Sequence, residues 1–297
     1  MARGSRPGGP DGVAVVDKPA GWTSHDVVAK SRGLLGTRKV GHSGTLDPDA
    51  TGVLVLGVGK ATRLLRYLTA LGKAYEAEIV LGVETTTLDA AGEVTATHDM
   101  AGVSLDDARA VVAASLTGPI LQVPPMVSAL KVDGRRLHEL AREGVEVERE
   151  ARPVTVHRFD LAATDDPLVL RAEVECSSGT YVRSLAADLG HALGGGAHLR
   201  ALRRTAVGGF TLADAVALEA LGPDDLHPVA AAVGHLPTLV VSGDVATAVG
   251  HGKVLDRSDL GAEGEGPWAV LDDEGRLRAV YAAHRATSLK PDLVIPL

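Results

Sequence analysis

The residues with the clearest chemical potential lie in one glycine-rich segment, residues 41–60. Asp47 stands between nearby glycines and is followed directly by Pro48, so its carboxylate belongs to a tight and sterically permissive loop. Such a loop can hold an acid at the floor of a cleft and let a second backbone come close. The alternative is a turn acid that bonds its own backbone.

The spacing of residues in the sequence tests two other kinds of site, a phosphate-binding loop and a metal site. Residues 57–62 look like the end of a phosphate-binding loop, but Leu54 replaces the glycine and Ala61 replaces the Ser or Thr that this loop requires. The 11 histidines are dispersed, without a His-Glu-x-x-His or Cys/His cluster, and a single cysteine excludes an intrachain disulfide. An NTPase and a metallohydrolase are therefore both disfavoured.

The loop must be positioned by elements whose patterns can be recognised. Apolar or alternating runs predict strands, and helical spacing and caps predict helices. The predicted strands are 13–17, 75–81, 154–161 and 168–176, and a strand followed by a helix is predicted for 51–71. The predicted helices are 24–35, with Ser24 as the cap, 104–116, 134–142 and 181–193, and residues 213–237 are predicted to be a helix plus linker. Helices do not alternate regularly with strands, which favours an α+β domain with a mixed or antiparallel sheet.

A second, smaller unit is predicted at the C-terminal end. Short strands recur from Leu239 onward, with residues 272–275 as a hairpin turn. At the other end, residues 1–12 are rich in Gly and Pro and lack an apolar core, which predicts a disordered tail rather than a signal peptide. No apolar run approaches membrane-spanning length, so we expect a cytoplasmic protein without membrane contact.

Composition is ordinary for a globular protein, but the charge is not that of a typical nucleic-acid binder. The 297 residues are 45% hydrophobic and 23% charged, which leaves room for one large or two medium domains. The net charge is −8, whereas nucleic-acid binders usually carry excess Lys and Arg. The basic residues are clustered locally, at 38–39, 63–66, 135–136, 149–152 and 200–204. One positive groove is sufficient for a specific RNA enzyme.

Several motifs together resemble one enzyme family. Gly-His-Ser-Gly-Thr-Leu-Asp-Pro at 41–48 is similar to the catalytic motif of the TruB class of tRNA pseudouridine synthases, which modify the T-loop uridine (position 55) of tRNA. Further blocks match in the family's order, at 13–24, 73–76, 124–131, 176–183 and 202–205. The resemblance covers roughly residues 12–215.

The resemblance implies a domain plan and a partner. Residues 13–237 would form the pseudouridine synthase catalytic domain, with 124–152 as an insertion that clamps RNA, and residues 238–297 a PUA-like RNA-binding domain. The sequence match is weak in this last region. The family acts on the T arm of tRNA without a cofactor or metal, and we expect a monomer without protein partners.

The same resemblance assigns roles to catalytic residues. Asp47 matches the aspartate that attacks the target nucleotide, and Arg183 the arginine that pairs with it. Tyr75 matches the aromatic residue that stacks on the flipped base and is a candidate to relay the C5 proton. Taken singly, Arg183 could be a solvated helix arginine, and Tyr75 a tyrosine of the core.

Other matched positions are expected to bind substrate. His42 matches the histidine that fills the space left by the flipped nucleotide. Leu202 would close the other side of the pocket, Lys18 would brace the active-site loop, and Lys131 would contact phosphate. Asp89 also matches a family position. The alternatives are an ordinary surface, core or turn residue in each case.

Two positions depart from the family pattern. Val127 stands where many members have Tyr or Phe, and Asp49 adds a second carboxylate where many members are apolar. Asp49 is a rival nucleophile, but Asp47 holds the motif's Leu-Asp-Pro position. The sequence leaves open whether Asp47 attacks C6 of the base or C1′ of the ribose. A protein of another class, which binds or folds tRNA without catalysis, is the alternative function.

Overall fold

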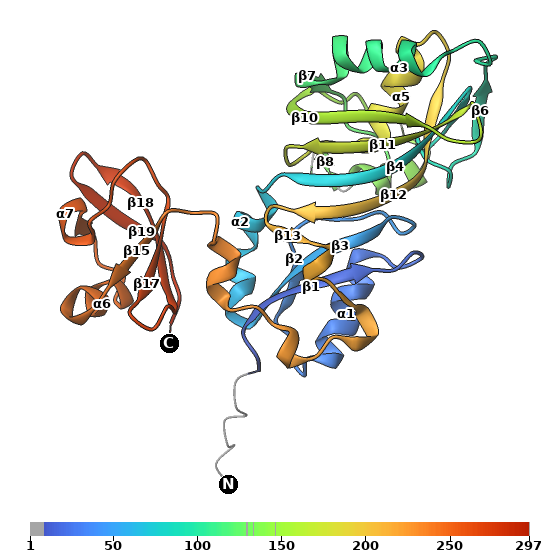
Figure 1. Ribbon diagram of the computed structural model, residues 1–297. Helices are drawn as coiled ribbons and strands as arrows, with labels where there is room; N and C mark the ends of the chain where they lie inside the picture. Colours follow the sequence, from blue (N-terminus) through green and yellow to red (C-terminus); the bar gives the residue numbers. More distant parts are fainter. Residues whose placement is uncertain (1–8, 129, 133, 146, 297) are drawn as a thin grey trace.

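The computed structural model describes residues 9–296, apart from residues 129, 133 and 146 and the side chains of residues 131, 132, 136, 138, 141 and 142. Two main sheets organise this part of the chain (Figure 1). The larger is built from residues 12–217, and the smaller lies at the C-terminal end. Two short hairpins, β5–β6 (Val83–Thr85, Val94–Thr97) and β8–β9 (Lys131–Val132, Arg135–Arg136), stand outside both.

The larger sheet has ten strands and is mixed. Its order is β14-β1-β3-β12-β4-β11-β10-β7, with β13 beside β12 and β2 beside β3. Most neighbours are antiparallel, whereas β12–β3 and β1–β14 are parallel. The strands are β1 (Gly12–Lys18), β2 (Val40–His42), β3 (Thr51–Val58), β4 (Lys73–Leu81), β7 (Gly118–Gln122), β10 (Arg152–Ala163), β11 (Val169–Cys176), β12 (Ala197–Val207), β13 (Phe210–Thr211) and β14 (Val216–Ala217). The predicted α+β class with a mixed sheet is therefore confirmed.

Helices cover the sheet because their apolar residues join its core. Leu185 and Leu189 of α5 and Ala108 of α3 pack with Ile79 of β4 and Val174 of β11. A separate cluster joins α1 to β1 and β3. The helices are α1 (Ser24–Leu34), α2 (Leu65–Thr69), α3 (Leu105–Val111), α4 (Leu137–Arg142), α5 (Val182–Ala192), α6 (Gly243–Gly250) and α7 (Arg257–Leu260).

The strand β12 lies in the middle of the larger sheet, yet it is not among the strands that the sequence predicts. Its pairing with β4 shifts register between Leu199 and Ala201 and again between Arg204 and Ala206. Each bulge adds a residue and so breaks the period of two by which a strand is recognised. The expected strands 154–161 and 168–176 are confirmed as the antiparallel pair β10–β11. β11 keeps the period of two without a bulge, and β10 keeps it on either side of a single bulge between Val156 and Arg158.

The predicted start of α1 is right, but the predicted cap is wrong. Thr23, not Ser24, is the N-cap: its hydroxyl accepts from the backbone N–H of Asp26, whose carboxylate accepts from the Thr23 backbone. The Ser24 hydroxyl turns inward and bonds the backbone of Leu46, accepting from its N–H at 2.9 Å and donating to its carbonyl at 3.2 Å. The residue at the start of the helix therefore holds the loop that carries Asp47.

Two predicted helices differ from the structure. Residues 213–237 form no α-helix; short 3-10 turns follow one another there, at Leu212–Asp214, Leu218–Ala220, Pro223–Asp225 and Val229–Val233. Pro223 and Pro228 lack the N–H that a continuous helix needs. The helix expected at 134–142 begins only at Leu137, because Arg135–Arg136 pair with Lys131–Val132 as a hairpin.

The C-terminal sheet begins at Thr238, the residue at which the sequence predicts a second domain. It has five strands in the order β15-β17-β18-β19-β16. These are β15 (Thr238–Val241), β16 (Leu255–Asp256), β17 (Trp268–Asp272), β18 (Leu277–Arg285) and β19 (Ser288–Val294). The predicted hairpin is confirmed, since β17 and β18 are antiparallel and the Asp272 carboxylate accepts from the backbone N–H of Glu274 and Arg276.

The chain is fixed near its beginning, before β1. The Asp11 carboxylate accepts from the backbone N–H of Lys60 at 2.7 Å, and Gly12 already belongs to β1. The predicted tail of residues 1–12 therefore ends earlier than expected, and residues 1–8 lie outside the described residues. None of the helices in the described part of the chain combines the length and apolar character that crossing a membrane requires.

Candidate active site

The loop between β2 and β3 carries Asp47 and is fastened at several points. Its backbone bonds run from the Ser43 N–H to the Val55 carbonyl and from the Ala50 N–H to the Asp47 carbonyl. Gly52 ends the loop with φ +98°, and a Cβ there would stand 2.1 Å from the Arg204 carbonyl oxygen. Only glycine permits this close approach of β3 to β12.

Lys18 ties the loop to the end of β1. Its side chain is fully buried, and its Nζ donates to the carbonyls of Pro19, Trp22 and Pro48 at 2.9, 2.6 and 2.8 Å. Burial lowers the pKa of Lys18 to about 8, although Asp49 and Asp47 oppose this effect. One ammonium therefore joins the turn after β1 to the residue that follows Asp47.

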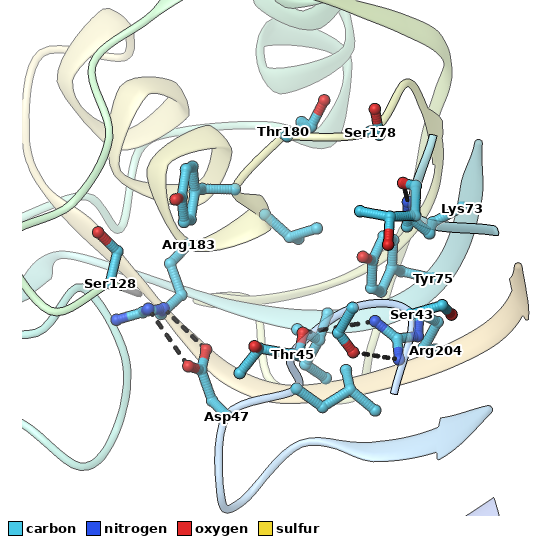
Figure 2. Close-up of a pocket in the computed structure, with 17 residues that line it drawn as sticks. Ser43, Thr45, Asp47, Lys73, Tyr75, Ser128, Ser178, Thr180, Arg183 and Arg204 are labelled. Atoms are coloured by element: carbon cyan, nitrogen blue, oxygen red, sulfur yellow. Dashed lines mark hydrogen bonds and ion pairs between the residues drawn. The ribbon is translucent and has the colours of Figure 1, made fainter. Parts of the chain in front are cut away.

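Asp47 forms an ion pair with Arg183, which α5 supplies. The guanidinium Nε lies 3.1 Å from Asp47 Oδ2 (Figure 2). On the other side of the guanidinium, Nη1 lies 3.4 Å from Asp89 Oδ2. Arg183 is 4% exposed and also donates to the carbonyls of Thr87 (2.9 Å) and Val127 (2.6 Å). Burial raises the pKa of Asp47, Arg183 lowers it, and Asp89 raises it further. The charged fork is thus held at four points, which fixes its orientation towards Asp47.

The pair lies at one side of a cavity of about 430 Å³, a volume suited to a small ligand. Tyr75 and Leu202 line this cavity together with Asp47 and Arg183, so the structure brings these four predicted residues together. Figure 2 shows Asp47 and Arg183 on one side, and Tyr75 with Lys73 and Arg204 on the other. Tyr75 is buried, and that burial raises the pKa of its hydroxyl.

A second cavity of about 420 Å³ adjoins the first and shares Asp47, Arg183 and Leu202 with it. Asp49 and Asp89 line this second cavity but not the first. Asp49 therefore lies away from Tyr75, whereas Asp47 faces both spaces. Val127 also lines it, but its bond to Arg183 comes from the backbone carbonyl, which does not depend on the side-chain type.

Arg204 is a site residue whose role the sequence does not predict. It is 1% exposed, and its guanidinium donates to the carbonyls of Val53 (2.7 Å), Gly44 (3.2 Å) and Thr45 (3.4 Å). In the sequence it is one member of a basic cluster and of the block 202–205, and nothing distinguishes it from its neighbour Arg203. Arg203 instead pairs with Asp17 at 2.7 Å and is partly exposed.

Of the two remaining predicted residues, His42 lies apart from the first cavity. His42 ends β2 and meets the His25 ring edge-on, with ring centroids 5.3 Å apart. Burial lowers the pKa of His42 to about 4, so the ring is neutral near pH 7. The side chain of Lys131 lies outside the described residues. No group of three or more His, Cys, Asp and Glu side chains that could hold a metal ion occurs among the residues that the structure describes.

Comparison with known proteins identifies the family. A model described as TruB family pseudouridylate synthase (N terminal domain) matches residues 32–182, and one described as tRNA pseudouridylate synthase B C-terminal domain matches residues 183–225. Proteins named tRNA pseudouridine synthase B are similar over nearly their whole length. The one from Rhodococcus jostii is 52% identical and the match covers 94% of this chain and 92% of that protein; the one from Thermobifida fusca is 50% identical, with 96% and 98% covered.

A solved structure shows the same architecture. The crystal structure of a Cbf5-Nop10-Gar1 complex contains a chain that matches with a TM-score of 0.77 at 28% identity, over 98% of this chain and 88% of that one. Its coverage includes both main sheets and confirms the expected pseudouridine synthase fold with a C-terminal domain. The sequence motifs, the domain models and the near full-length relatives agree, and the chain belongs to the TruB family of pseudouridylate synthases.

Proposed function

We propose that this protein converts the T-loop uridine (position 55) of tRNA to pseudouridine, with Asp47 as the nucleophile. One observation carries the proposal: in a chain of the TruB family, the Asp47–Arg183 ion pair stands at the wall of a cavity that Tyr75 and Leu202 also line. The relatives named tRNA pseudouridine synthase B support tRNA as the substrate.

The reaction is an isomerisation, so the protein needs only to break one bond and direct another. The N1–C1′ bond of the uridine breaks, the base turns within the cavity, and C5 joins C1′ while a proton leaves C5 and one returns to N1. A carboxylate assists by attacking the nucleotide, at C1′ or at C6. Arg183 keeps Asp47 ionised against the burial that raises its pKa.

The surrounding residues fix the reacting groups. Arg183 cannot rotate freely, because Thr87 and Asp89 bind its Nη1 while Nη2 donates to both Val127 and Asp47. The Tyr75 ring and Leu202 offer flat and apolar surfaces between which a uracil can stack and turn. Bound RNA would cover the open side of the cavity and so keep water from the detached base.

The target base lies inside a folded RNA loop and must be extruded before it reaches Asp47. His42 precedes the catalytic loop and its ring is neutral, so it can enter the space of the flipped base without the desolvation cost of a charge. The basic residues of 124–152 are suited to bind T-arm phosphates, and the C-terminal sheet to extend the RNA contact. These roles are part of the proposal.

The test is carbodiimide labelling and primer extension on an unmodified tRNA transcript incubated with the protein alone. We expect one new stop at the T-loop uridine, absent with Asp47→Asn, which preserves shape but removes the charge. Asp49→Asn is the matched control, since it replaces an acid two positions away. With this variant the stop at the T-loop uridine should still appear. The opposite pattern would assign the nucleophile to Asp49.

Binding must be measured on the same transcripts. We expect Asp47→Asn to bind tRNA as tightly as the unchanged protein, since catalysis and RNA binding use different groups. An unchanged protein that binds tRNA but produces no stop would contradict the proposal and favour a tRNA-binding or folding function without catalysis.

A further inference from the structure

Two positively charged side chains line the side of the first cavity that lies opposite the Asp47–Arg183 pair. They belong to Lys73, the first residue of β4, and Arg204 of β12, and both line the cavity beside Tyr75 (Figure 2). The two side chains approach the same point: a Cβ placed on Gly44 would lie 3.7 Å from Arg204 Nη1 and 3.8 Å from Lys73 Cε.

Neither cation has an acidic partner. Lys73 Nζ donates to the carbonyls of Thr69 (2.8 Å) and Leu71 (2.6 Å). Arg204 donates to backbone carbonyls and also forms a side-chain hydrogen bond with Tyr75. Within the described part of the chain, no carboxylate lies within ion-pair distance of either. This differs from the opposite side of the cavity, where Asp47 and Asp89 both contact Arg183.

Unpaired and partly buried charge is costly, so the arrangement needs a reason. Burial, and to a smaller extent the nearby Arg204 guanidinium, lower the pKa of Lys73 to about 8. At neutral pH Lys73 nonetheless remains mostly protonated. A bound anion at this side of the cavity would compensate both charges.

The proposed reaction generates such an anion. When the N1–C1′ bond breaks, its electron pair stays with N1, and the negative charge spreads over N1 and the carbonyl oxygens of the uracil. C1′ becomes electron-deficient and is captured by the Asp47 carboxylate or loses a proton from C2′. The base then has to remain in the cavity, still charged, until C5 bonds to C1′.

We propose that Lys73 and Arg204 form a cationic wall that stabilises the detached uracil anion while it turns. The inference rests on the proposed function and deepens it: this wall attracts the developing charge, whereas Asp47 acts on the sugar or the base. Fixed charges that face a developing anion in an enclosed site lower the barrier without reorganisation of solvent. Arg204 additionally holds the catalytic loop through Gly44 and Thr45, so Lys73 is the residue to test.

The experiment compares two substrates and three variants under single-turnover conditions. The substrates are T-arm stem-loop RNAs with either uridine or 5-fluorouridine at the target position, scored by loss of the N1-linked nucleoside. Fluorine withdraws electrons and makes the leaving base more acidic, so cleavage depends less on external stabilisation. The variants are Lys73→Met, which removes the charge, Lys73→Arg, which keeps it, and the control Lys60→Met, which removes a lysine that pairs with Asp11 outside the cavity.

We expect Lys73→Met to slow conversion of uridine by roughly 10- to 100-fold. The same variant should slow the conversion of 5-fluorouridine several times less than that of uridine. Its Kd for RNA should change by less than about threefold. Lys73→Arg should recover most of the rate. Lys60→Met should behave as the unchanged protein. If Lys73→Met does not fold, Lys73→Gln replaces it, since its amide can still donate to the Thr69 carbonyl.

Other results would overturn the inference. If Lys73→Met slowed both substrates equally, the role of Lys73 would be structural, as a cap at the C-terminal end of α2. The same conclusion would follow if Lys73→Arg did not recover the rate. A weaker Kd with a smaller salt dependence and an unchanged rate would make Lys73 a phosphate contact. If the unchanged protein does not convert uridine at all, the proposed function itself fails, and the cationic wall with it.

Discussion

At the scale of single residues, the site is a balance of charges around Asp47. Burial raises the pKa of this carboxyl, Arg183 lowers it, and Asp89 raises it again. Arg183 is shared between both acids, so each acid limits how strongly the fork can act on the other. The ionisation of Asp47 therefore depends on a neighbour that does not line the first cavity.

This balance predicts the effect of Asp89→Asn on the pH profile. In the proposed reaction the ionised form of Asp47 is the active form, so the rate should fall as pH falls through its pKa. Removing the negative charge of Asp89 lowers that pKa, and the acidic limb of the kcat profile should move to lower pH by about half a unit or more. Asn retains an oxygen to accept from the Ala91 N–H, which now bonds Asp89 Oδ1 at 3.1 Å, so the turn is preserved.

The profile is measured between pH 4.5 and 8 with saturating tRNA. Asp49→Asn is the control, because Asp49 is the weakest of the influences that act on the Asp47 pKa, and its profile should move less. A shift of the Asp89→Asn profile to higher pH would contradict the assignment of Asp89 as a destabilising neighbour of the ionised nucleophile.

At the scale of elements, the catalytic loop is positioned by the beginning of α1. Ser24 is 1% exposed, and its hydroxyl makes both a donated and an accepted bond with the backbone of Leu46, the residue before Asp47. The Thr23 cap and the Leu46 bonds together determine where the helix and the loop meet. A change at the start of the helix can therefore displace Asp47 without contacting it.

Ser24→Ala should destabilise the fold by about 1–3 kcal/mol, because the Leu46 N–H and carbonyl lose their partner in a buried place. It should also lower kcat roughly 10-fold, since small displacements of a nucleophile are costly. Urea unfolding and single-turnover rates measure the two effects. Ser31→Ala is the matched control in the same helix: Ser31 is equally buried but donates only to the Val27 carbonyl. A larger rate loss in Ser31→Ala would refute the role of Ser24.

At the scale of the whole molecule, the C-terminal sheet is joined to the larger one by both apolar and charged contacts. Ile295, Ala269 and Val280 share a core cluster with residues of β1, β3 and α2. On the surface, Arg66 Nη2 lies 2.5 Å from Asp292 Oδ2, and Arg63 donates to the Val294 carbonyl. The two kinds of contact can be separated by mutation.

We expect the apolar contact to dominate the stability. Ile295 is 5% exposed, so Ile295→Ala should reduce the free energy of unfolding by about 2–4 kcal/mol. Asp292→Ala should change it by less than about 1 kcal/mol, because Arg66 and Asp292 are both substantially exposed. Urea titration followed by Trp268 fluorescence compares them, and a greater loss in Asp292→Ala would show that the ion pair dominates.

The sequence by itself determined the parts whose signal is local. The Asp47 loop is recognisable from its own glycines and proline, β11 keeps the period of two, and β10 keeps it except at one bulge. The hairpin at Asp272 likewise depends on residues within its own turn. The order of the motif blocks also identified the family and the pair Asp47 and Arg183, although 136 residues separate them.

Only the tertiary structure decided the parts whose signal is distant. The strand β12 is recognisable only by its pairing with β3 and β4, because its bulges obscure the alternation in the sequence. Arg204 differs from Arg203 only by the side of β12 on which it lies, and that side is buried against the catalytic loop. Residues 213–237 have a helix-like composition, but their prolines and their packing against other elements select short turns instead. For β12 and Arg204 the deciding contacts come from residues far away in the chain, and local patterns carry no record of them.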